Sequence, residues 1–231
     1  ARYWRVGING KPIFLSGLLD QGYTAEGLLT YPSEEAMRFE LEKIKAMGFN
    51  MIRKHIKVEN RRWYALCDQI GLLVMQDMPS GGHPYSFWRI AIGPTLGLRT
   101  MSDGPDAYKK NGREKKESRD MYMMELDGML DTLYNCPCIF AWVPFNEGWG
   151  QFESVQVTEH IRAYDTTRLI DSASGWHDHG AGDFDSRHCY FRSFHMPHSS
   201  ERIILLSEFG GYTYVEQGHG VPKKAYGYKK F

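Results

Sequence analysis

Short apolar runs that are typical of buried strands alternate with amphipathic stretches along most of this chain of 231 residues. Apolar residues recur at helical spacing in the stretches between the runs. This alternation predicts parallel strands joined by crossover helices, because strands that run in the same direction cannot be joined by a short hairpin. We therefore expect an α/β fold, a TIM (β/α)8-type barrel, rather than a β-sandwich.

The runs predict seven strands and four helices. The strands are expected at residues 12–17, 49–55, 72–77, 138–144, 168–174, 187–191 and 202–207, and the helices at about 33–48, 63–70, 118–134 and 157–164. No eighth strand is evident, so the barrel is predicted to be incomplete at its C-terminus. An open doubly wound sheet is the alternative, but no glycine-rich phosphate loop follows the first strand. Residues 80–116 predict a long functional excursion over the barrel mouth.

The composition restricts the kinds of partner. Basic and acidic residues number 28 each, so no net field favours nucleic acid or a membrane surface, and a neutral or polar partner fits better. No apolar stretch approaches the roughly 18 to 20 residues of a membrane span, and the first residues do not resemble a signal peptide. The four cysteines lack CxxC spacing and are expected to be free thiols. No motif implies a cofactor.

Two glutamates directly follow strand-like runs. Glu147 comes after CIFAWVPFN, and Glu208 comes after RIILLS. In a parallel barrel the loops after the strands carry the active site, so both carboxyls are expected on one rim. Such a pair fits the hydrolysis of a glycosidic bond, with Glu147 as acid and Glu208 as nucleophile. The alternatives are helix capping by Asn146 and Glu147, and a salt-bridged Glu208 that closes its strand.

Neighbouring residues are candidates for substrate contact. Asn146 can bond a sugar hydroxyl, and the indole of Trp149 offers a face on which a sugar ring can stack. Trp176 is either a second platform or part of the core. His188 and Tyr190, near the end of the sixth strand, are expected to face the rim, where the tyrosine would orient the nucleophile.

The end of the second strand supplies two more candidates. Arg53 and His55 are predicted either to reach the substrate or nucleophile, or to pair with Asp77, which ends the third strand. Residues 177–188 are rich in His and Asp and can be read as a metal site. No HExxH or comparable spacing is present there, so no metal is predicted.

Three segments resemble the catalytic barrel of glycoside hydrolase family 2, the family of β-galactosidases, β-glucuronidases and β-mannosidases. They are RKHIKVENRRWYALCDQIGLLVMQDMPSGG, WVPFNEGWGQ and SEFGG, and the opening NGKPIFLSGLLDQGY is similar to that barrel's first strand. The resemblance implies that Glu147 is the general acid/base at the end of the fourth strand and that Glu208 is the nucleophile at the end of the seventh. It implies a retaining exo-β-glycosidase, most similar to a β-galactosidase, acting on a β-glycoside through a covalent glycosyl-enzyme.

The chain also departs from the family's pattern. Arg53 to Ile56 stand where better-known members carry a Ser-His-Tyr-Pro-like stretch, and Gln76-Asp77-Met78 stands where they carry Asp-Glu. An Asn-x-Lys signature is not evident, which disfavours a β-glucuronidase. We expect residues 1–231 to be a single catalytic domain of a longer protein with N-terminal β-sandwich domains. A non-catalytic carbohydrate-binding or structural fragment is the alternative, and a metal-dependent hydrolase ranks last.

Overall fold

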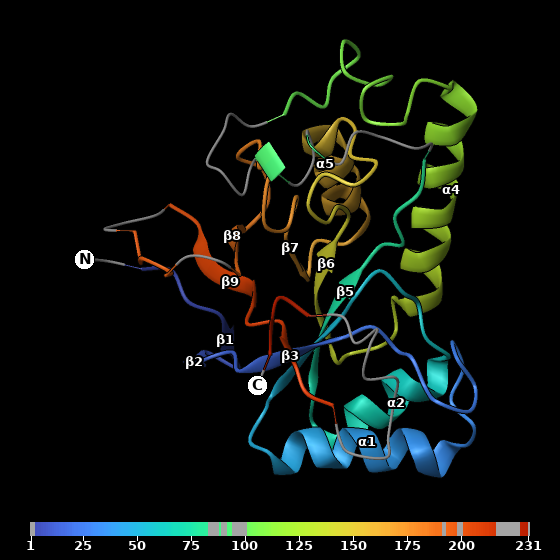
Figure 1. Ribbon diagram of the computed structural model, residues 1–231, viewed down its shortest axis with the longest axis vertical. Coiled ribbons are helices and arrows are strands. Elements are labelled where there is room, and N and C mark those ends of the chain that lie inside the picture. Colours follow the sequence, from blue (N-terminus) through green and yellow to red (C-terminus); the bar gives the residue numbers. More distant parts are fainter. Residues whose placement is uncertain are drawn as a thin grey trace.

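Parallel strands in chain order form the centre of the structure, a computed structural model that describes residues 3–82, 88, 92–93, 101–190, 193–197, 201–215 and 227–230. The main sheet consists of β3 (Gly17–Asp20), β4 (Met51–Lys54), β5 (Leu73–Asp77), β6 (Ile139–Val143) and β7 (Leu169–Ile170), each paired with the next. A second parallel pair consists of β8 (Phe184–Cys189) and β9 (Ile203–Phe209). This order agrees with the predicted barrel-type fold (Figure 1).

Helices cover the outside of the sheet. They are α1 (Glu34–Ala46), α2 (Arg61–Ile70), α4 (Lys116–Leu133) and α5 (Ser154–Tyr164). Figure 1 shows α1 and α2 side by side at one end of the molecule and α4 along its flank. Apolar residues of all four helices form one buried cluster with residues of β4 to β7. None of the described helices is long and apolar enough to cross a membrane.

Local signals define the start of α1 and the end of α2. Ser33 is the N-cap of α1, and its Oγ accepts from the N–H of Ala36 over 3.2 Å. Gly71 ends α2 in the left-handed conformation, with φ 76°, and its N–H donates to the carbonyl of Cys67. The four predicted helices are confirmed, although α4 begins at Lys116 and α5 at Ser154, slightly before the predicted positions.

Side-chain alternation decides which strand residues reach the interior of the barrel. Ile52 and Trp142 pack toward the helices, whereas Met75 belongs to a separate interior cluster. Arg53 pairs in register with Met75 and shares its face. Lys54, on the opposite face, is fully buried with its ammonium 4.6 Å from the centre of the Trp63 ring.

The first predicted strand is wrong in position. Residues 12–16 do not enter the main sheet, and only Gly17 of the predicted strand belongs to it. Instead β2 (Lys11–Pro12) pairs antiparallel with β1 (Gly7–Ile8), and the strand that pairs with β4 begins only at Gly17. Asn9 and Gly10 have φ angles of 51° and 75°, as in the tight turn that closes a two-residue hairpin. The hairpin takes Pro12, the first residue of the apolar run, into β2.

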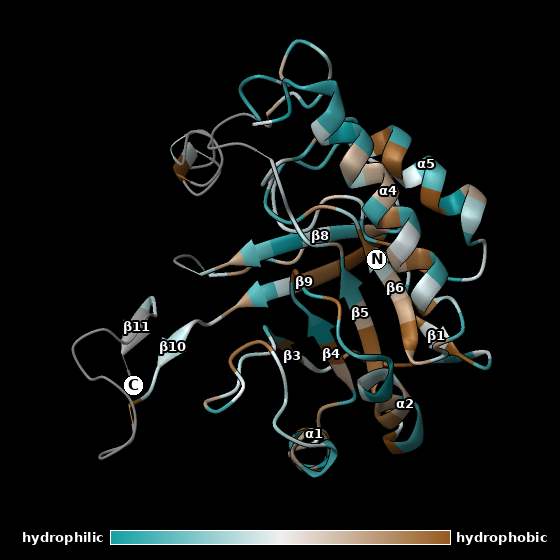
Figure 2. Ribbon diagram, turned by 90° about the vertical axis from the view of Figure 1, so that its right-hand side faces the viewer, coloured by the Kyte–Doolittle hydropathy of each residue, from teal (hydrophilic) through white to brown (hydrophobic). Residues whose placement is uncertain are grey.

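The later strands differ from prediction in length. Residues 168–174 form a ladder only over β7, and β8 begins at Phe184 rather than at 187. Figure 2 shows the reason: β8 is largely hydrophilic, whereas the first half of β9 is hydrophobic. Runs of apolar residues therefore indicate β9 but not the start of β8. In the described tail, β10 (Tyr212–Thr213) pairs with β11 (Lys229–Lys230) as a separate ladder.

Candidate active site

Glu147 lies in the loop that follows β6. Asn146 forms a parallel bridge with Ser174, and the N–H of Glu147 donates to the Ser174 carbonyl over 2.9 Å. The backbone of Glu147 is left-handed, with φ 52°, which costs about 1 to 2 kcal/mol for a residue other than glycine. The N-cap of α5 is Glu153. The interpretation of Asn146 and Glu147 as helix caps is therefore wrong.

A register shift in β9 directs Glu208 into the barrel. Arg187 of β8 pairs with Leu206, but the next residue, His188, pairs with Glu208, so that Ser207 is an extra residue in β9. Such a bulge interrupts the strict alternation of side chains. Glu208 consequently lies opposite His188 and is only 7% exposed.

Arg53 connects the ends of three strands. Its Nε and Nη2 donate to the two carboxylate oxygens of Asp77 over 3.0 and 2.9 Å. Nη2 also donates to Asn146 Oδ1, and Nη1 donates to Glu208 Oε1, both over 2.9 Å. The two interpretations of Arg53, contact with the glutamate and pairing with Asp77, thus hold together. Asp77 is 1% exposed. It therefore supports Arg53, and the prediction that it contacts a substrate is wrong.

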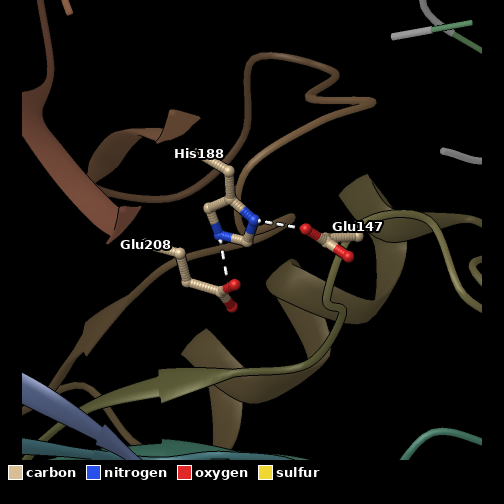
Figure 3. A group of neighbouring side chains, drawn as sticks. All are labelled: Glu147, His188 and Glu208. Atoms are coloured by element: carbon tan, nitrogen blue, oxygen red, sulfur yellow. Dashed lines mark hydrogen bonds and ion pairs between the residues drawn. The ribbon is translucent and has the colours of Figure 1, made fainter. Parts of the chain in front are cut away.

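The imidazole of His188 lies between the two glutamates, as Figure 3 shows. Its Nδ1 is 2.7 Å from Glu147 Oε1, and its Nε2 is 3.5 Å from Glu208 Oε1. Burial and the charge of Arg53 outweigh the attraction of Glu208 and lower the pKa of His188 to about 3. The ring is therefore neutral at physiological pH.

One carboxylate oxygen of Glu147 and one of Glu208 lie within 4.8 Å of each other. Together with a nitrogen of His188, these oxygens form a group of described side chains that is compact enough to hold a metal ion. However, Arg53 Nη1 already donates to the Glu208 oxygen and lies 3.3 Å from His188 Nε2. A guanidinium cation thus already contacts two of these three groups, Glu208 and His188.

Two further predicted residues surround Glu208. The hydroxyl of Tyr190 donates to Glu208 Oε2, so Arg53 and Tyr190 hold different oxygens of one carboxylate. His55 Nε2 lies 3.6 Å from Glu208 Oε1 and is buried without a hydrogen-bond partner among the described residues. Burial, followed by the charge of Arg53, lowers the pKa of His55 to about 3. His55 is therefore neutral.

Two half-buried tryptophans lie at the site, Trp149 beside Glu147 and Trp176 beside His188. Trp149 Nε1 donates to Glu147 Oε2 over 3.3 Å. Trp176 lies edge-on to His188 with ring centres 5.9 Å apart. Burial raises the pKa of Glu147, and the Trp149 donor with the charges of Arg53 and His177 opposes this only in part. A carboxyl in this state keeps its proton to a higher pH than an exposed glutamate.

Residues 101–113 hold the loop after β6 in place through hydrogen bonds. Asp103 Oδ2 accepts from Gln151 Nε2 over 2.9 Å, and Arg113 Nε donates to the carbonyl of Gly150 over 2.7 Å. The predicted excursion over the barrel mouth lies partly outside the described residues. Its described end supports the loop that carries Glu147.

The His and Asp side chains of residues 177–188 do not gather at one point. Most bind separate partners: His177 accepts from the N–H of Met101, Asp178 pairs with Arg202, His179 lies 3.5 Å from Asp103, Asp183 pairs with Arg162, and Asp185 pairs with Arg187. His188 is the member of this stretch that reaches the two glutamates. The pattern in the sequence reflects loop ion pairs.

A buried polar cluster beneath His188 was missed by the sequence analysis. Ser174 Oγ lies 3.2 Å from His188 Nε2 and donates to Ser207 Oγ over 3.2 Å, and Ser186 Oγ is 2.6 Å from Ser207 Oγ. Burial raises the pKa of the adjacent Asp171 to about 7. The spacing of two between Ser186 and His188 is the signal that indicates a shared inward face.

The sequence pattern described as "Glycosyl hydrolases family 2, TIM barrel domain" matches residues 4–211, which include both glutamates. The chain belongs to glycosyl hydrolase family 2. This assignment confirms the resemblance and the predicted TIM-barrel fold, and it accounts for parallel strands that follow one another in chain order.

Relatives within the family are distant. The chain is 26% identical over 176 residues to a beta-galactosidase of Vibrio cholerae, covering 76% of this chain and 14% of the relative. It is 29% identical over 179 residues to a beta-galactosidase of Lactococcus lactis, covering 76% and 15%. The chain thus spans about one seventh of the length of these curated relatives.

Solved structures share the fold. A family 2 beta-galacturonidase from Eisenbergiella tayi, bound to galacturonate, superposes with a TM-score of 0.60 at 18% identity, covering 93% of this chain and 38% of that chain. A beta-glucuronidase from an uncultured Clostridium species gives a TM-score of 0.59 at 18% identity, covering 81% and 31%. At this identity the likeness concerns the fold alone.

Proposed function

We propose that the chain carries the catalytic site of a retaining β-glycosidase. The observation that carries the proposal is the spacing of Glu147 and Glu208, whose nearest carboxylate oxygens lie within 4.8 Å. Retaining glycosidases hold the two carboxyls about 5 to 5.5 Å apart, whereas inverting enzymes leave about 6.5 to 9.5 Å to admit a water. The short gap favours direct attack by one carboxylate and a covalent glycosyl-enzyme.

Glu208 is the proposed nucleophile. Arg53 donates to its Oε1 and Tyr190 to its Oε2. These two bonds fix the direction of the carboxylate, and a fixed carboxylate is suited to attack an anomeric carbon.

Glu147 is the proposed general acid and base. In the first step its proton passes to the glycosidic oxygen while the bond from that oxygen to the anomeric carbon breaks and Glu208 bonds to the carbon. In the second step Glu147 takes a proton from water, the water oxygen bonds to the anomeric carbon, and Glu208 leaves. Two displacements retain the anomeric configuration. Burial, which raises the pKa of Glu147, suits the acid role.

The surrounding side chains define a sugar subsite. Because Asn146 Oδ1 accepts from Arg53, its amide N–H groups are available for the 2-hydroxyl. His55 Nε2, which has no hydrogen-bond partner among the described residues, provides a second polar contact, and the half-buried rings of Trp149 and Trp176 provide platforms. Arg53, the guanidinium at the glutamates, is engaged by carboxylates of the chain, which favours a neutral sugar over a uronic acid.

A terminal β-galactoside is the proposed substrate. The relatives from Vibrio cholerae and Lactococcus lactis are named beta-galactosidases, and the neutral character of the subsite is compatible with galactose. The rival reading, a non-catalytic sugar-binding unit, predicts binding without hydrolysis.

Glutamate variants of the intact natural protein that carries this chain test the proposal on aryl β-galactosides. We expect Glu208→Gln to abolish turnover. Glu147→Ala should lose about 10²- to 10⁴-fold on a poor leaving group and much less on an acidic one, which needs little protonation. Glu125→Gln, on the exposed face of α4, is the control and should behave like the wild type.

Added azide separates the two roles. With Glu147→Ala, azide attacks the glycosyl-enzyme and gives a β-glycosyl azide, whereas with Glu208→Ala azide replaces the nucleophile and gives an α-glycosyl azide. The opposite anomers, or full activity of Glu208→Gln, would refute the assignment. Galactose binding by a wild-type protein that cleaves no aryl β-glycoside would support the non-catalytic reading.

A further inference from the structure

His188 is a buried side chain that touches both glutamates without reaching the solvent. Its side chain is fully buried, while those of Glu147 and Glu208 are 15% and 5% exposed. The ring therefore lies beneath the carboxyls and is not placed as an open contact for a sugar. Its effect on the reaction must pass through the glutamates.

The neighbours of Nε2 fix the tautomer of His188. Arg53 Nη1 lies 3.3 Å from Nε2, and a guanidinium can only donate hydrogen bonds. In a neutral imidazole one nitrogen accepts and the other carries the hydrogen. The hydrogen is therefore on Nδ1, which donates to Glu147 Oε1 over 2.7 Å, a length typical of a bond to a charged oxygen.

The backbone of Gly175 makes room for the ring in this position. Gly175 has φ 88°, and a Cβ atom at this residue would overlap Nδ1, Cγ and Cε1 of His188. The imidazole thus packs directly against the Gly175 backbone, with Trp176 at its edge. Gly175 and Arg53 together hold the Nδ1–H in the direction of Glu147.

We propose that His188 is a positioning residue for Glu147: the Nδ1–H bond fixes the direction of the carboxyl and stabilises its charged form. The proposal rests on the proposed function, in which Glu147 must release a proton and then act as a base. Burial favours the protonated carboxyl, and a donor to Oε1 opposes this effect. His188 thereby keeps both protonation states of Glu147 within reach at one working pH.

Several other groups act on the same carboxyl or ring and must be held constant in a test. Those that face Glu147 are Trp149 on its own loop, His177 after β7 and Arg53 on β4; those that face His188 are Arg53, His55, Ser174, Trp176, Tyr190 and Glu208. All stay unchanged when His188 alone is replaced.

A matched pair of amide variants isolates the Nδ1–H bond. In His188→Asn the side-chain amide stands near the place of Nδ1 and can still donate to Glu147. In His188→Gln the amide reaches the place of Nε2 and the donor to Glu147 is lost. The measurement is the pKa of Glu147, followed by NMR of the 13C-labelled carboxyl in the intact protein without substrate. The alkaline limb of the pH profile of kcat/KM is measured beside it.

In His188→Gln we expect the pKa of Glu147 and the alkaline limb to rise by about one pH unit, the size of shift that one such interaction produces. His188→Asn should stay close to the wild type. Gly175→Ala, which displaces the ring without removing it, should shift in the same direction as His188→Gln. In the wild type, 15N NMR of the ring should find the hydrogen on Nδ1.

An unmoved Glu147 pKa in His188→Gln, equal shifts in the Asn and Gln variants, or a hydrogen on Nε2 would overturn the proposal. The proposed function fails in a different way, if the wild type cleaves no aryl β-glycoside. In that event the NMR titration still decides whether His188 sets the pKa of Glu147.

Discussion

Arg53 and Glu208 come from β4 and β9, and the hydrogen bond of 2.9 Å between Nη1 and Oε1 joins them inside the barrel. Their side chains are 2% and 5% exposed, so the two charges depend on each other and on Asp77 for compensation. Removing one partner of such a buried pair leaves an uncompensated charge. The Arg53 guanidinium therefore contributes both to the stability of the barrel and to the position of the proposed nucleophile.

The first prediction concerns Arg53→Lys. A lysine keeps the charge but lacks the planar fork that serves Asp77, Asn146 and Glu208 together. Because some of these buried acceptors lose their donor, we expect a loss of about 1 to 3 kcal/mol in the free energy of unfolding, together with loss of hydrolysis of an aryl β-galactoside. Urea unfolding followed by circular dichroism measures the first quantity.

The control for this prediction is Arg187→Lys. Arg187 points outward from β8 and pairs with Asp185 over 3.0 Å with 48% of its side chain exposed. Its replacement should change the unfolding free energy by no more than about 0.5 kcal/mol. Similar losses in both variants would contradict the central place given to Arg53.

The second prediction concerns Gly150 in the loop after β6. Gly150 has φ 63°, and a Cβ atom there would overlap the carbonyl oxygen of Gly81. Gly180 has φ 83° with nothing within 4 Å of such an atom. At either site an alanine in the left-handed conformation destabilises the fold by about 1 to 2 kcal/mol. Only Gly150→Ala must also displace the loop that carries Glu147.

We therefore expect Gly150→Ala to lower kcat/KM on an aryl β-galactoside by tenfold or more, and Gly180→Ala to leave it within twofold of the wild type. Thermal unfolding should show a larger drop in Tm for Gly150→Ala. Equal activities in the two variants would mean that the position of this loop does not govern the reaction.

Local signals explain what the sequence could predict. The ends of α1 and α2 depend on Ser33 and Gly71, whose effects act within one turn of helix. Strands β4, β5 and β6 are buried, and they place Arg53, near the end of β4, and Glu147, in the loop after β6, at one edge of the sheet. These features are determined by residues that are close in the sequence, so they can be predicted from a single sequence.

Pairing between distant segments explains the rest. The bulge at Ser207 exists only in the register of β9 against β8, and extrapolating strict alternation from Ser207 would turn Glu208 outward. The contact between His188 and Glu147 spans 41 positions and depends on space left by Gly175. The positions of Glu147 and Glu208 were predictable, whereas the side chains that hold them were only partly so.

The third prediction concerns stability at low pH. Asp165 is fully buried; its Oδ2 accepts from Trp142 Nε1 over 3.0 Å and from Arg168 Nη1 over 2.7 Å, and its Oδ1 accepts from Thr167. Burial acts in the opposite direction, but these donors hold the pKa of Asp165 well below its ordinary value. A depressed folded-state pKa contributes stability above the unfolded-state pKa of about 3.9, and this stability is lost as pH falls further.

Asp165→Asn should therefore lower the unfolding free energy at pH 7 by about 1 to 3 kcal/mol, and the difference from the wild type should shrink below about pH 4. Urea unfolding at a series of pH values measures both. Asp120→Asn, which removes an exposed pair with Lys116, should change stability by less than about 1 kcal/mol. A gap between Asp165→Asn and the wild type that is constant from pH 7 to pH 3 would disprove the linkage.

The last prediction concerns Tyr190→Phe. The change removes the donor to Glu208 Oε2 and keeps the ring, which packs against Tyr228 with centres 4.4 Å apart. A hydrogen bond to a charged group contributes about 1.5 to 3 kcal/mol, so the variant should lose about 10- to 150-fold in kcat/KM on an aryl β-galactoside. Rapid-mixing kinetics should place this loss in formation of the glycosyl-enzyme, the step in which Glu208 attacks. Tyr134→Phe, at the C-terminal end of α4, is the matched control. Equal activity of the two variants would show that Tyr190 does not contribute to the reaction.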